Sequence, residues 1–391
     1  MRDRAREKLV IVGGAIMGSF AAWSLRREGF SGEITVIEKD PSYRFCSTAL
    51  SAAAIRTQFG TPVNIQMSLF GVDFFRKIKQ SFGPAADIGY REEGYLILGG
   101  PETVAARHAA AAMQRAEGAD VLALTPDEIA ARFPYMSMEG VGIGTFGATG
   151  EGWFDAWSLL SLVRGAAKDL GVRYVAGEVA GFDLSGDRIQ SVRLAGGESL
   201  SCDWCVMAAG AASGGLMAAL GQPLPVSPRK RTVFSFRAPL KAGNFPMLFD
   251  NSGIWIRPEG DGFIGGIQPP ADRDPVATGD FEPDHSLMQD VFWPALAARI
   301  PAMEELRLER AWAGHYEVNA LDHNGVVGLH DEIANLVLST GFSGHGVMHA
   351  PAAGRGMAEL IIHGGFVGLD LSPLGYGRIR TGTPLPESIV Y

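Results

Sequence analysis

The stretch LVIVGGAIMGSFAAWSLRREGFSGEITVIEKD, residues 9–40, decides the fold that this sequence predicts. Its first four residues form an apolar, β-branched run of the length expected for a buried parallel strand. A helical pattern follows, and a second strand, residues 34–37, ends on Glu38. The glycines between the first strand and the helix are Gly13, Gly14 and Gly18. This order and spacing are typical of a dinucleotide-binding βαβ unit.

Each part of this unit has a physical role. Gly13 permits the tight turn out of the strand, and Gly18 lets the helix pack closely on the sheet. The unpaired amides at the helix start favour a pyrophosphate, while Glu38 can accept hydrogen bonds from both ribose hydroxyls and repels the 2′-phosphate of NADP. Ala15 departs from the pattern, because it occupies the middle glycine position. The predicted cofactor contacts here are Gly13, Gly14, Ala15, Ile16, Met17, Gly18, Glu38 and Lys39. The alternative is that these glycines only let the helix pack on the sheet and that no dinucleotide binds there.

Composition narrows the class of protein. The chain has 391 residues, 47% of them hydrophobic and 20% charged, which is ordinary for a globular enzyme. A net charge of −9 argues against nucleic acid or an anionic membrane as the main partner. No run of about 18 apolar residues predicts a membrane span, and residues 1–8 do not resemble a secretion signal. Three cysteines do not make a disulfide framework, so we expect a reducing compartment, the cytoplasm. The Cys202/Cys205 pair is interpreted as ordinary strand residues.

A second strand, glycine turn and helix occupy residues 335–364, more than 300 residues after the first unit. Two such units predict a cofactor held at both ends. The second helix start favours a group that gains negative charge, and a reduced flavin, anionic around N1 and the C2 oxygen, suits it better than nicotinamide. Other helices are expected at residues 64–82, 101–117, 125–133, 155–170 and 283–300, and strands at 90–99, 184–194, 199–209, 232–236, 253–257, 262–266 and 307–316. The small residues at 47–54 could approach a flat ring closely, or form a helix on the sheet.

These motifs resemble the D-amino-acid oxidase/glycine oxidase/sarcosine oxidase superfamily of FAD-dependent oxidoreductases. The resemblance covers GGAIMGS at the start, STALSAAAIRTQF after the acid, EGYLILG, AAG, and GFSGHGVMHAPAAGRGMAELI near the end. Residues 312–328, WAGHYEVNALDHNGVVG, are similar to the pattern W-A-G-x-Y-x-x-N-x-x-D-x-N-G-V-x-G. That pattern belongs to a subgroup of mitochondrial FAD-dependent oxidoreductase-domain proteins implicated in complex I assembly, and to their bacterial relatives.

The resemblance implies an α/β fold in which a Rossmann-type FAD-binding domain is interleaved with a substrate domain built on an antiparallel β-sheet with helices. The FAD domain would comprise residues 1–82, 148–222 and 323–375, the substrate domain 83–147 and 223–322, and a C-terminal tail 376–391. FAD would be non-covalent, because Gly314 stands where sarcosine oxidases have the tethering cysteine. The further FAD contacts that the resemblance implies are Ser47, Thr48, Val179, Gly210, Gly344, His345, Gly346, Val347 and Met348.

This sequence differs from the family at positions that bind the substrate carboxylate or activate oxygen. Met348 replaces a carboxylate-binding lysine, and Ile264 replaces an oxygen-activating lysine. His315 and Tyr316 follow the strand where other members have a carboxylate-binding arginine, and only one of them can face the flavin. Arg56 matches a carboxylate-binding arginine, with an interface ion pair as the alternative. The candidate catalytic residues are Arg56, Arg257, His315, Tyr316 and His345. No metal site is predicted, because no carboxylate accompanies His345 and His349.

We therefore expect an FAD-dependent amine or amino-acid oxidase or dehydrogenase, with hydride transfer from the carbon beside nitrogen to flavin N5 and hydrolysis of the resulting imine. The substrate would be an amino acid or N-substituted amino acid, and the acceptor O2 or another oxidant. The missing lysine at Ile264 favours a dehydrogenase. Two alternatives stay open: a 2-hydroxy-acid dehydrogenase with His315 or His345 as base, and a flavin-bearing assembly factor without turnover. Oligomeric state and stereochemical preference are undetermined.

Overall fold

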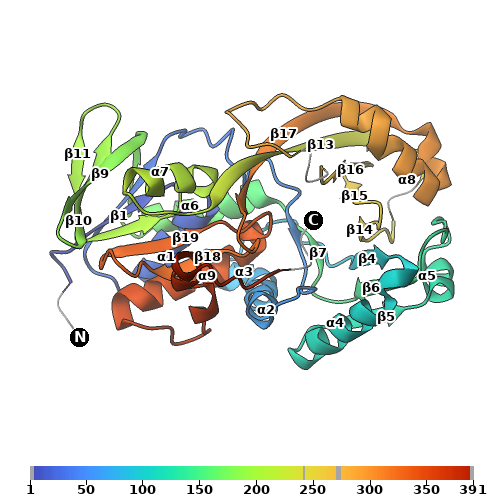
Figure 1. Cartoon of the computed structure of the whole chain (residues 1–391), viewed down its shortest axis with the longest axis horizontal. Helices are drawn as coiled ribbons and strands as arrows, with labels where there is room; N and C mark the ends of the chain where they lie inside the picture. The colour runs from blue at the N-terminus through green and yellow to red at the C-terminus, as the bar shows by residue number, and fades with distance from the viewer. Residues whose placement is uncertain (1–3, 241–242, 270–273, 388–391) are drawn as a thin grey trace.

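The protein has two halves, each built on its own β-sheet (Figure 1). The computed structural model describes residues 4–240, 243–269 and 274–387, so the expectations for residues 1–3 and 388–391 lie outside the described residues. One sheet has six strands in the order β18-β19-β12-β1-β2-β8, and the other has eight in the order β17-β13-β16-β15-β14-β4-β6-β5. The α/β fold with parallel and antiparallel sheets is therefore confirmed.

The six-stranded sheet carries the two glycine turns. Its strands are β1 (Lys8–Val12), β2 (Glu33–Glu38), β8 (Arg173–Ala176), β12 (Trp204–Met207), β18 (Val326–Leu329) and β19 (Leu336–Thr340). β1 is parallel to β2 and β12, and β12 is parallel to β19, so the carboxyl ends of β1 and β19 lie at the same edge.

Both faces of this sheet are covered by other elements. One face packs on helices α1 (Ile16–Arg27), α2 (Pro62–Arg76), α3 (Ile78–Phe82), α6 (Ala156–Asp169) and α9 (Gly346–His363). The other face packs on α7 (Ser213–Ala219) and on a small sheet of β9 (Val179–Ser185), β10 (Arg188–Leu194) and β11 (Ser199–Ser201). Burial on both faces explains why the strands of this sheet are continuous apolar runs rather than alternating ones.

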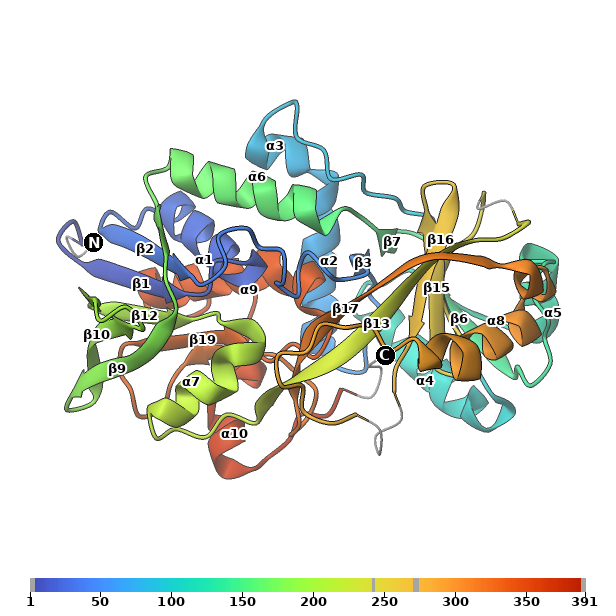
Figure 2. The ribbon, with the colours of Figure 1, turned by 90° about the horizontal axis from the view of Figure 1, so that it is seen from above.

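The eight-stranded sheet forms the second half. Its strands are β4 (Tyr95–Gly99), β5 (Val121–Leu124), β6 (Ile143–Gly147), β13 (Val226–Arg237), β14 (Met247–Phe249), β15 (Ile254–Glu259), β16 (Gly262–Ile267) and β17 (Arg307–Asn319). Its helices are α4 (Val104–Ala116), α5 (Pro126–Arg132), a π-helix (Met288–Phe292) and α8 (Trp293–Arg299). The long antiparallel pair β13 and β17 runs from one half to the other (Figure 2). A short pair, β3 (Ala54–Ile55) with β7 (Gly152–Trp153), lies between the halves.

Most predicted elements are present, and three local predictions are wrong. The expected strand at 184–194 is a hairpin, because Gly186 turns the chain with φ of +60° between β9 and β10. The expected strand at 199–209 is interrupted at Cys202 and Asp203, so the CxxC pair lies only partly in a strand. The helical region after residue 283 starts later than expected. Residues 47–53 form no helix, which excludes the alternative interpretation of that segment. The strands of the two sheets fall inside the ranges expected for the two domains, while the domain boundaries themselves stay predictions.

The segment predicted as a C-terminal tail is packed onto the protein. It forms the short helix α10 (Gly377–Thr381) after the 3-10 turn Ser372–Leu374. Arg378 lies 2.7 Å from Asp322 in a buried ion pair. Glu387 accepts hydrogen bonds from the amide of Gly60 at 2.6 Å and from Asn64 at 3.0 Å. Glu387, the last described residue, is therefore attached to the start of α2.

Candidate active site

The first glycine turn is closed too tightly for side chains. Gly13 has φ of +97°, and a Cβ on it would lie 2.3 Å from the carbonyl oxygen of Ala208 at the end of β12. A Cβ on Gly18 would lie 1.9 Å from the carbonyl oxygen of Gly13. Both glycines thus have the close-packing roles predicted for them. Ala15 precedes α1 and is half-buried, so its methyl group is accommodated.

Glu38 lies at the mouth of this turn. Its carboxylate accepts hydrogen bonds from the amide of Gly14 at 2.8 Å and from the amide of Asp40 at 2.9 Å. The amide of Gly177 donates to the carbonyl oxygen of Glu38 at 2.9 Å, which brings the chain just before Val179 beside the same strand end. The ribose contact expected of Glu38 and the adenine contact expected of Val179 stay predictions. Lys39 is exposed to solvent.

The second glycine turn contacts the first. Residues 341–345 connect β19 to α9, and a Cβ on Gly346 would lie 3.1 Å from Cε of Met17 in α1. The hydroxyl of Thr340, at the end of β19, donates to the carbonyl oxygen of Gly210 at 3.2 Å. Gly344 has φ of +103° and lies against the ring of Tyr316. Two turns more than 300 residues apart in the chain therefore form one binding surface.

The segment from Ser47 to Arg56 crosses between the halves without a helix. The Ser47 hydroxyl donates to the carbonyl oxygen of His315 at 2.6 Å, and Thr48 is buried. The indole of Trp312 donates to the carbonyl oxygen of Leu50 at 3.1 Å. These bonds hold the small residues of this segment, which form turns at residues 47–50, beside β17.

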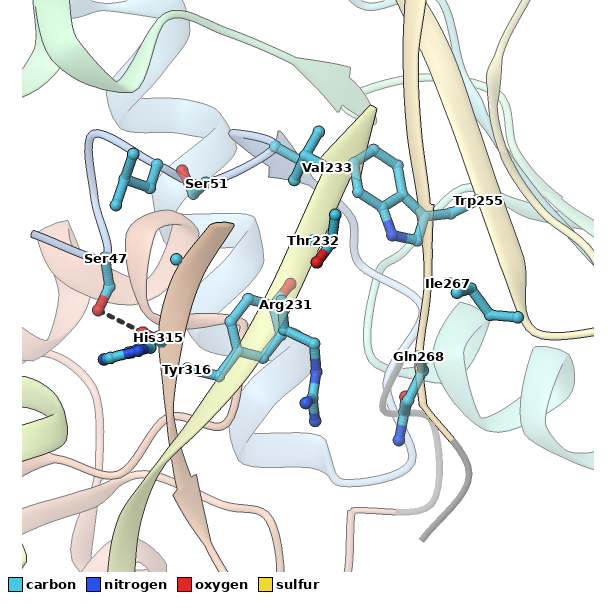
Figure 3. Close-up of a pocket in the computed structure, with 13 residues that line it drawn as sticks. Ser47, Ser51, Arg231, Thr232, Val233, Trp255, Ile267, Gln268, His315 and Tyr316 are labelled. Atoms are coloured by element: carbon cyan, nitrogen blue, oxygen red, sulfur yellow. Dashed lines mark hydrogen bonds between the residues drawn. The ribbon is translucent and has the colours of Figure 1, made fainter. Parts of the chain in front are cut away.

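Two adjoining cavities lie between this segment, the second glycine turn and the large sheet. The first is drawn in Figure 3. The second includes Arg56, Tyr95, Phe249 and the second glycine turn in its wall. Both cavities share Ser51, Ala52, Trp255 and Tyr316 in their walls. No Asp or Glu is among the described residues that line either cavity.

His315 and Tyr316 have opposite orientations, as their neighbouring positions in β17 require. Tyr316 lines both cavities, and burial raises the pKa of its phenol. The His315 ring stacks on Phe281 with centroids 4.1 Å apart, and its Nε2 lies 2.7 Å from the carbonyl oxygen of Asp280. In Figure 3 the His315 ring points away from Tyr316, Arg231 and Trp255, although His315 is among the residues that line the first cavity. The catalytic role expected of Tyr316 stays a prediction, and the contacts of His315 oppose such a role for that residue.

Arg56 and His345 belong to a buried cluster at the second cavity. The guanidinium of Arg56 lies 4.0 Å from the ring centroid of Phe59 and donates to the carbonyl oxygen of Gln58. His345 lines the cavity, and its Nε2 has no hydrogen-bond partner within the described ranges. Burial, with the nearby His349 and Arg56, holds the pKa of His345 well below its usual range, so the ring is neutral. Burial also lowers the pKa of His349 to about 3, and its Nε2 lies 2.9 Å from the Ser68 hydroxyl.

The guanidinium of Arg257 is held by contacts with the backbone and with Glu259. Its Nε donates to the carbonyl oxygen of Ala52 at 2.8 Å, and Nη1 contacts both the Pro258 carbonyl oxygen and the Glu259 carboxylate. The guanidinium therefore supports the segment beside the cavities instead of pointing into them, which corrects the expected catalytic position. Among the described residues, no cluster of His, Cys, Asp or Glu has the arrangement of a metal site.

Sequence reasoning missed the aromatic wall of the second cavity and the arginine of the first. Tyr95, Phe249 and Trp255 lie on one face of the large sheet, where Tyr95 stacks on Phe249 with centroids 5.6 Å apart. Arg231, in β13, lines the first cavity. Period-two alternation in YLILG and RTVFSF was a usable signal for which residues share a face, although it does not say which face borders the ligand.

The geometry fits FAD. Two glycine turns meet at one sheet edge, Glu38 lies at the end of β2 beside the first turn, and a cavity adjoins the second turn and the large sheet. These features define a flavin-dependent oxidoreductase with a Rossmann-type FAD site, which Gly13–Gly18, Glu38, Ser47, Thr48 and Gly344–Met348 would hold. Gly314 has no side chain, consistent with the expectation of non-covalent FAD.

The comparisons agree with this class. Residues 8–360 match the family model DAO, described as "FAD dependent oxidoreductase", and the chain belongs to this family. It is 38% identical to "FAD-dependent oxidoreductase domain-containing protein 1" of Xenopus laevis, over 98% of this chain and 84% of that protein. It is 25% identical to mitochondrial dimethylglycine dehydrogenase of Homo sapiens, over 97% of this chain and 45% of that protein. The crystal structure of L-proline dehydrogenase from P. horikoshii is similar with a TM-score of 0.85 and 28% identity, over 96% of this chain and 98% of that one. Within the described ranges, no helix is both long and apolar enough to span a membrane.

Proposed function

We propose that the protein oxidises the C–N bond of an amino acid or N-substituted amino acid. The observation that carries this proposal is the composition of the cavity walls, where a buried guanidinium and aromatic rings occur without a described carboxylate. A neutral amine needs no base, because it loses only a hydride from the carbon beside nitrogen. FAD, when bound, supplies the hydride acceptor. The amine becomes an imine, which water cleaves to a carbonyl compound and the free amine.

The residues of this chain bind and orient such a substrate. Arg56 is 4% exposed and presents a positive charge to a substrate carboxylate. The rings of Tyr95, Phe249 and Trp255 exclude water and favour the apolar part of the amine. The similarity to an L-proline dehydrogenase and a dimethylglycine dehydrogenase also supports a secondary or tertiary amine. Ile264 lies buried on the same sheet face, where it supplies no charge for oxygen activation, so a dehydrogenase is favoured.

A 2-hydroxy-acid dehydrogenase is the second candidate, because the unpartnered Nε2 of His345 lines the cavity and could take a hydroxyl proton. The lowered pKa of this ring opposes it, since a weaker base accepts the proton less readily.

Anaerobic flavin bleaching tests both candidates. The purified holoprotein would be mixed with proline, N-methylglycine, N,N-dimethylglycine, other D- and L-amino acids, lactate and 2-hydroxyglutarate. We expect bleaching by an amine, slow recovery in air, and a KM raised about 10- to 100-fold in Arg56→Gln. Arg107→Gln is the matched control, because Arg107 on α4 bonds the carbonyl oxygen of Leu98 at 3.2 Å. Bleaching by a hydroxy acid alone would refute the proposal, and a flavin reduced by no compound would favour an assembly role.

A further inference from the structure

Arg231, which lines the first cavity, forms an internal ion pair with Asp274. Nη1 and Nη2 of Arg231 donate to the two carboxylate oxygens of Asp274 at 2.7 and 2.9 Å. The two side chains are 12% and 18% exposed. Nε of Arg231 is buried and has no hydrogen-bond partner within the described ranges, although a buried N–H donor normally has one. The guanidinium also lies 5.3 Å from the ring centroid of Tyr316.

The segment that carries Asp274 is attached to β13 by several contacts. The amide of Ala277 donates to the Pro228 carbonyl oxygen at 2.9 Å, and Lys230 pairs with Asp280 at 2.5 Å. The Asp274 carboxylate thus binds Arg231 in the bidentate geometry that a ligand carboxylate would adopt. Figure 3 shows Arg231 beside Tyr316, with Gln268 extending from β16 on the opposite side of the cavity.

We propose that Arg231 is a second carboxylate-binding residue, and that Asp274 holds its guanidinium until a ligand carboxylate replaces it. This inference rests on the proposed function and narrows its substrate to an amine that carries two carboxylates. Arg56 in the second cavity would bind one carboxylate, and Arg231 in the first cavity the other. The cavities adjoin at Ser51, Ala52, Trp255 and Tyr316, so one molecule can extend through both.

Exchange of one carboxylate for another makes this arrangement feasible. The guanidinium stays paired throughout, and the Asp274 carboxylate moves toward solvent, so no unpaired charge is left buried. The unpartnered Nε adds a donor that the internal pair leaves unused. A ligand that bonds Nε as well as Nη therefore competes with Asp274, while a monocarboxylate held at Arg56 does not reach this pair.

Inert acids test the inference without turnover. Glutarate and butyrate would be titrated into the holoprotein, with the change in flavin absorbance giving each Kd. We expect glutarate to bind more tightly than butyrate. Arg231→Gln should weaken glutarate about 10- to 100-fold and leave butyrate unchanged, whereas Asp274→Asn should tighten glutarate. Lys230→Gln is the matched control, because its partner Asp280 lies in the same segment and its side chain does not line the cavity.

The outcomes separate the two proposals. If Arg231→Gln and Asp274→Asn lower the melting temperature but leave the glutarate-to-butyrate ratio unchanged, the pair is structural and the inference is wrong. If the ratio changes as expected while no amine bleaches the flavin, the carboxylate site stands and the amine oxidation fails. If an amine monocarboxylate bleaches the flavin and the ratio is insensitive to Arg231→Gln, the proposed function stands without a second carboxylate.

Discussion

Glu151 should make the protein less stable as the pH rises toward 8. This residue lies between β6 and β7 and is fully buried. Its carboxylate accepts hydrogen bonds from the amide and hydroxyl of Thr57 at 2.7 and 2.5 Å, and from the side-chain amide of Gln58 at 2.8 Å. Burial nevertheless dominates these bonds and raises the pKa of Glu151 from 4.5 to about 7.

The sign and the size of the effect follow from this pKa. Because the folded-state pKa lies above the unfolded one, the stability is complete below the unfolded value and is lost as the pH rises through about 7. Between pH 5 and pH 8 the loss is about 2.5 kcal/mol. For a chain of 391 residues, that corresponds to a fall of about 3 °C in melting temperature.

Thermal unfolding of the holoprotein across this pH range is the assay. Glu151→Gln has no proton to lose, so the wild-type melting temperature should fall by about 3 °C relative to this variant. Glu128→Gln is the control, because Glu128 caps α5 on the surface and the hydrogen bonds from Thr125 lower the pKa of its carboxyl. Parallel profiles for the wild type and Glu151→Gln would refute the reasoning, since they would mean that Glu151 is ionised at no cost.

Three further predictions concern the cofactor site and the packed tail. Gly18→Ala should purify without FAD, judged by the ratio of flavin to protein absorbance, whereas Gly165→Ala in α6, whose Cβ meets no atom within 4 Å, should retain it. Glu38→Ala should weaken FAD binding about 10- to 100-fold in a fluorescence titration of apoprotein, with Glu33→Ala, at the exposed end of the same strand, unchanged. Asp322→Ala should lose about 3–5 kcal/mol, because it leaves a buried guanidinium unpaired, and thermal unfolding should show a melting temperature lower by several degrees.

Local patterns predicted much of the fold. The glycine turn after β1 and the capping box at Thr125, in which the Glu128 amide donates to the threonine hydroxyl, depend on neighbouring residues alone. The hairpin at Gly186 was missed because apolar residues continue on both sides of the turn, so periodicity alone does not reveal the break. Turn chemistry at Ser185-Gly186-Asp187 was the overlooked signal.

The candidate site could be predicted only in part, because its wall is assembled by non-local pairing. Arg56 and His345 were found through motifs. Arg231, however, lies in a strand of alternating polar and apolar residues, and its basic neighbours are typical of a solvent-exposed strand at a sheet edge. Its partner Asp274 is 43 residues away in the chain. Which face of β13 borders the cavity depends on its register with β17, and nothing local encodes that register.

Most polar residues of the segment that carries the family resemblance make hydrogen bonds that stabilise the fold. In residues 312–328, Asn319 donates to Asp322 at 2.9 Å, and Asn324 donates to the carbonyl oxygen of Leu385 at 2.6 Å, so these polar residues fasten the C-terminal segment. Trp312 fastens the segment beside the cavities, and Tyr316 alone of these residues presents a side chain to both cavities. A motif whose residues mainly stabilise the fold identifies the family but does not identify the substrate. The charged residues of the cavity walls lie outside it, which is why the tests above address Arg56 and Arg231.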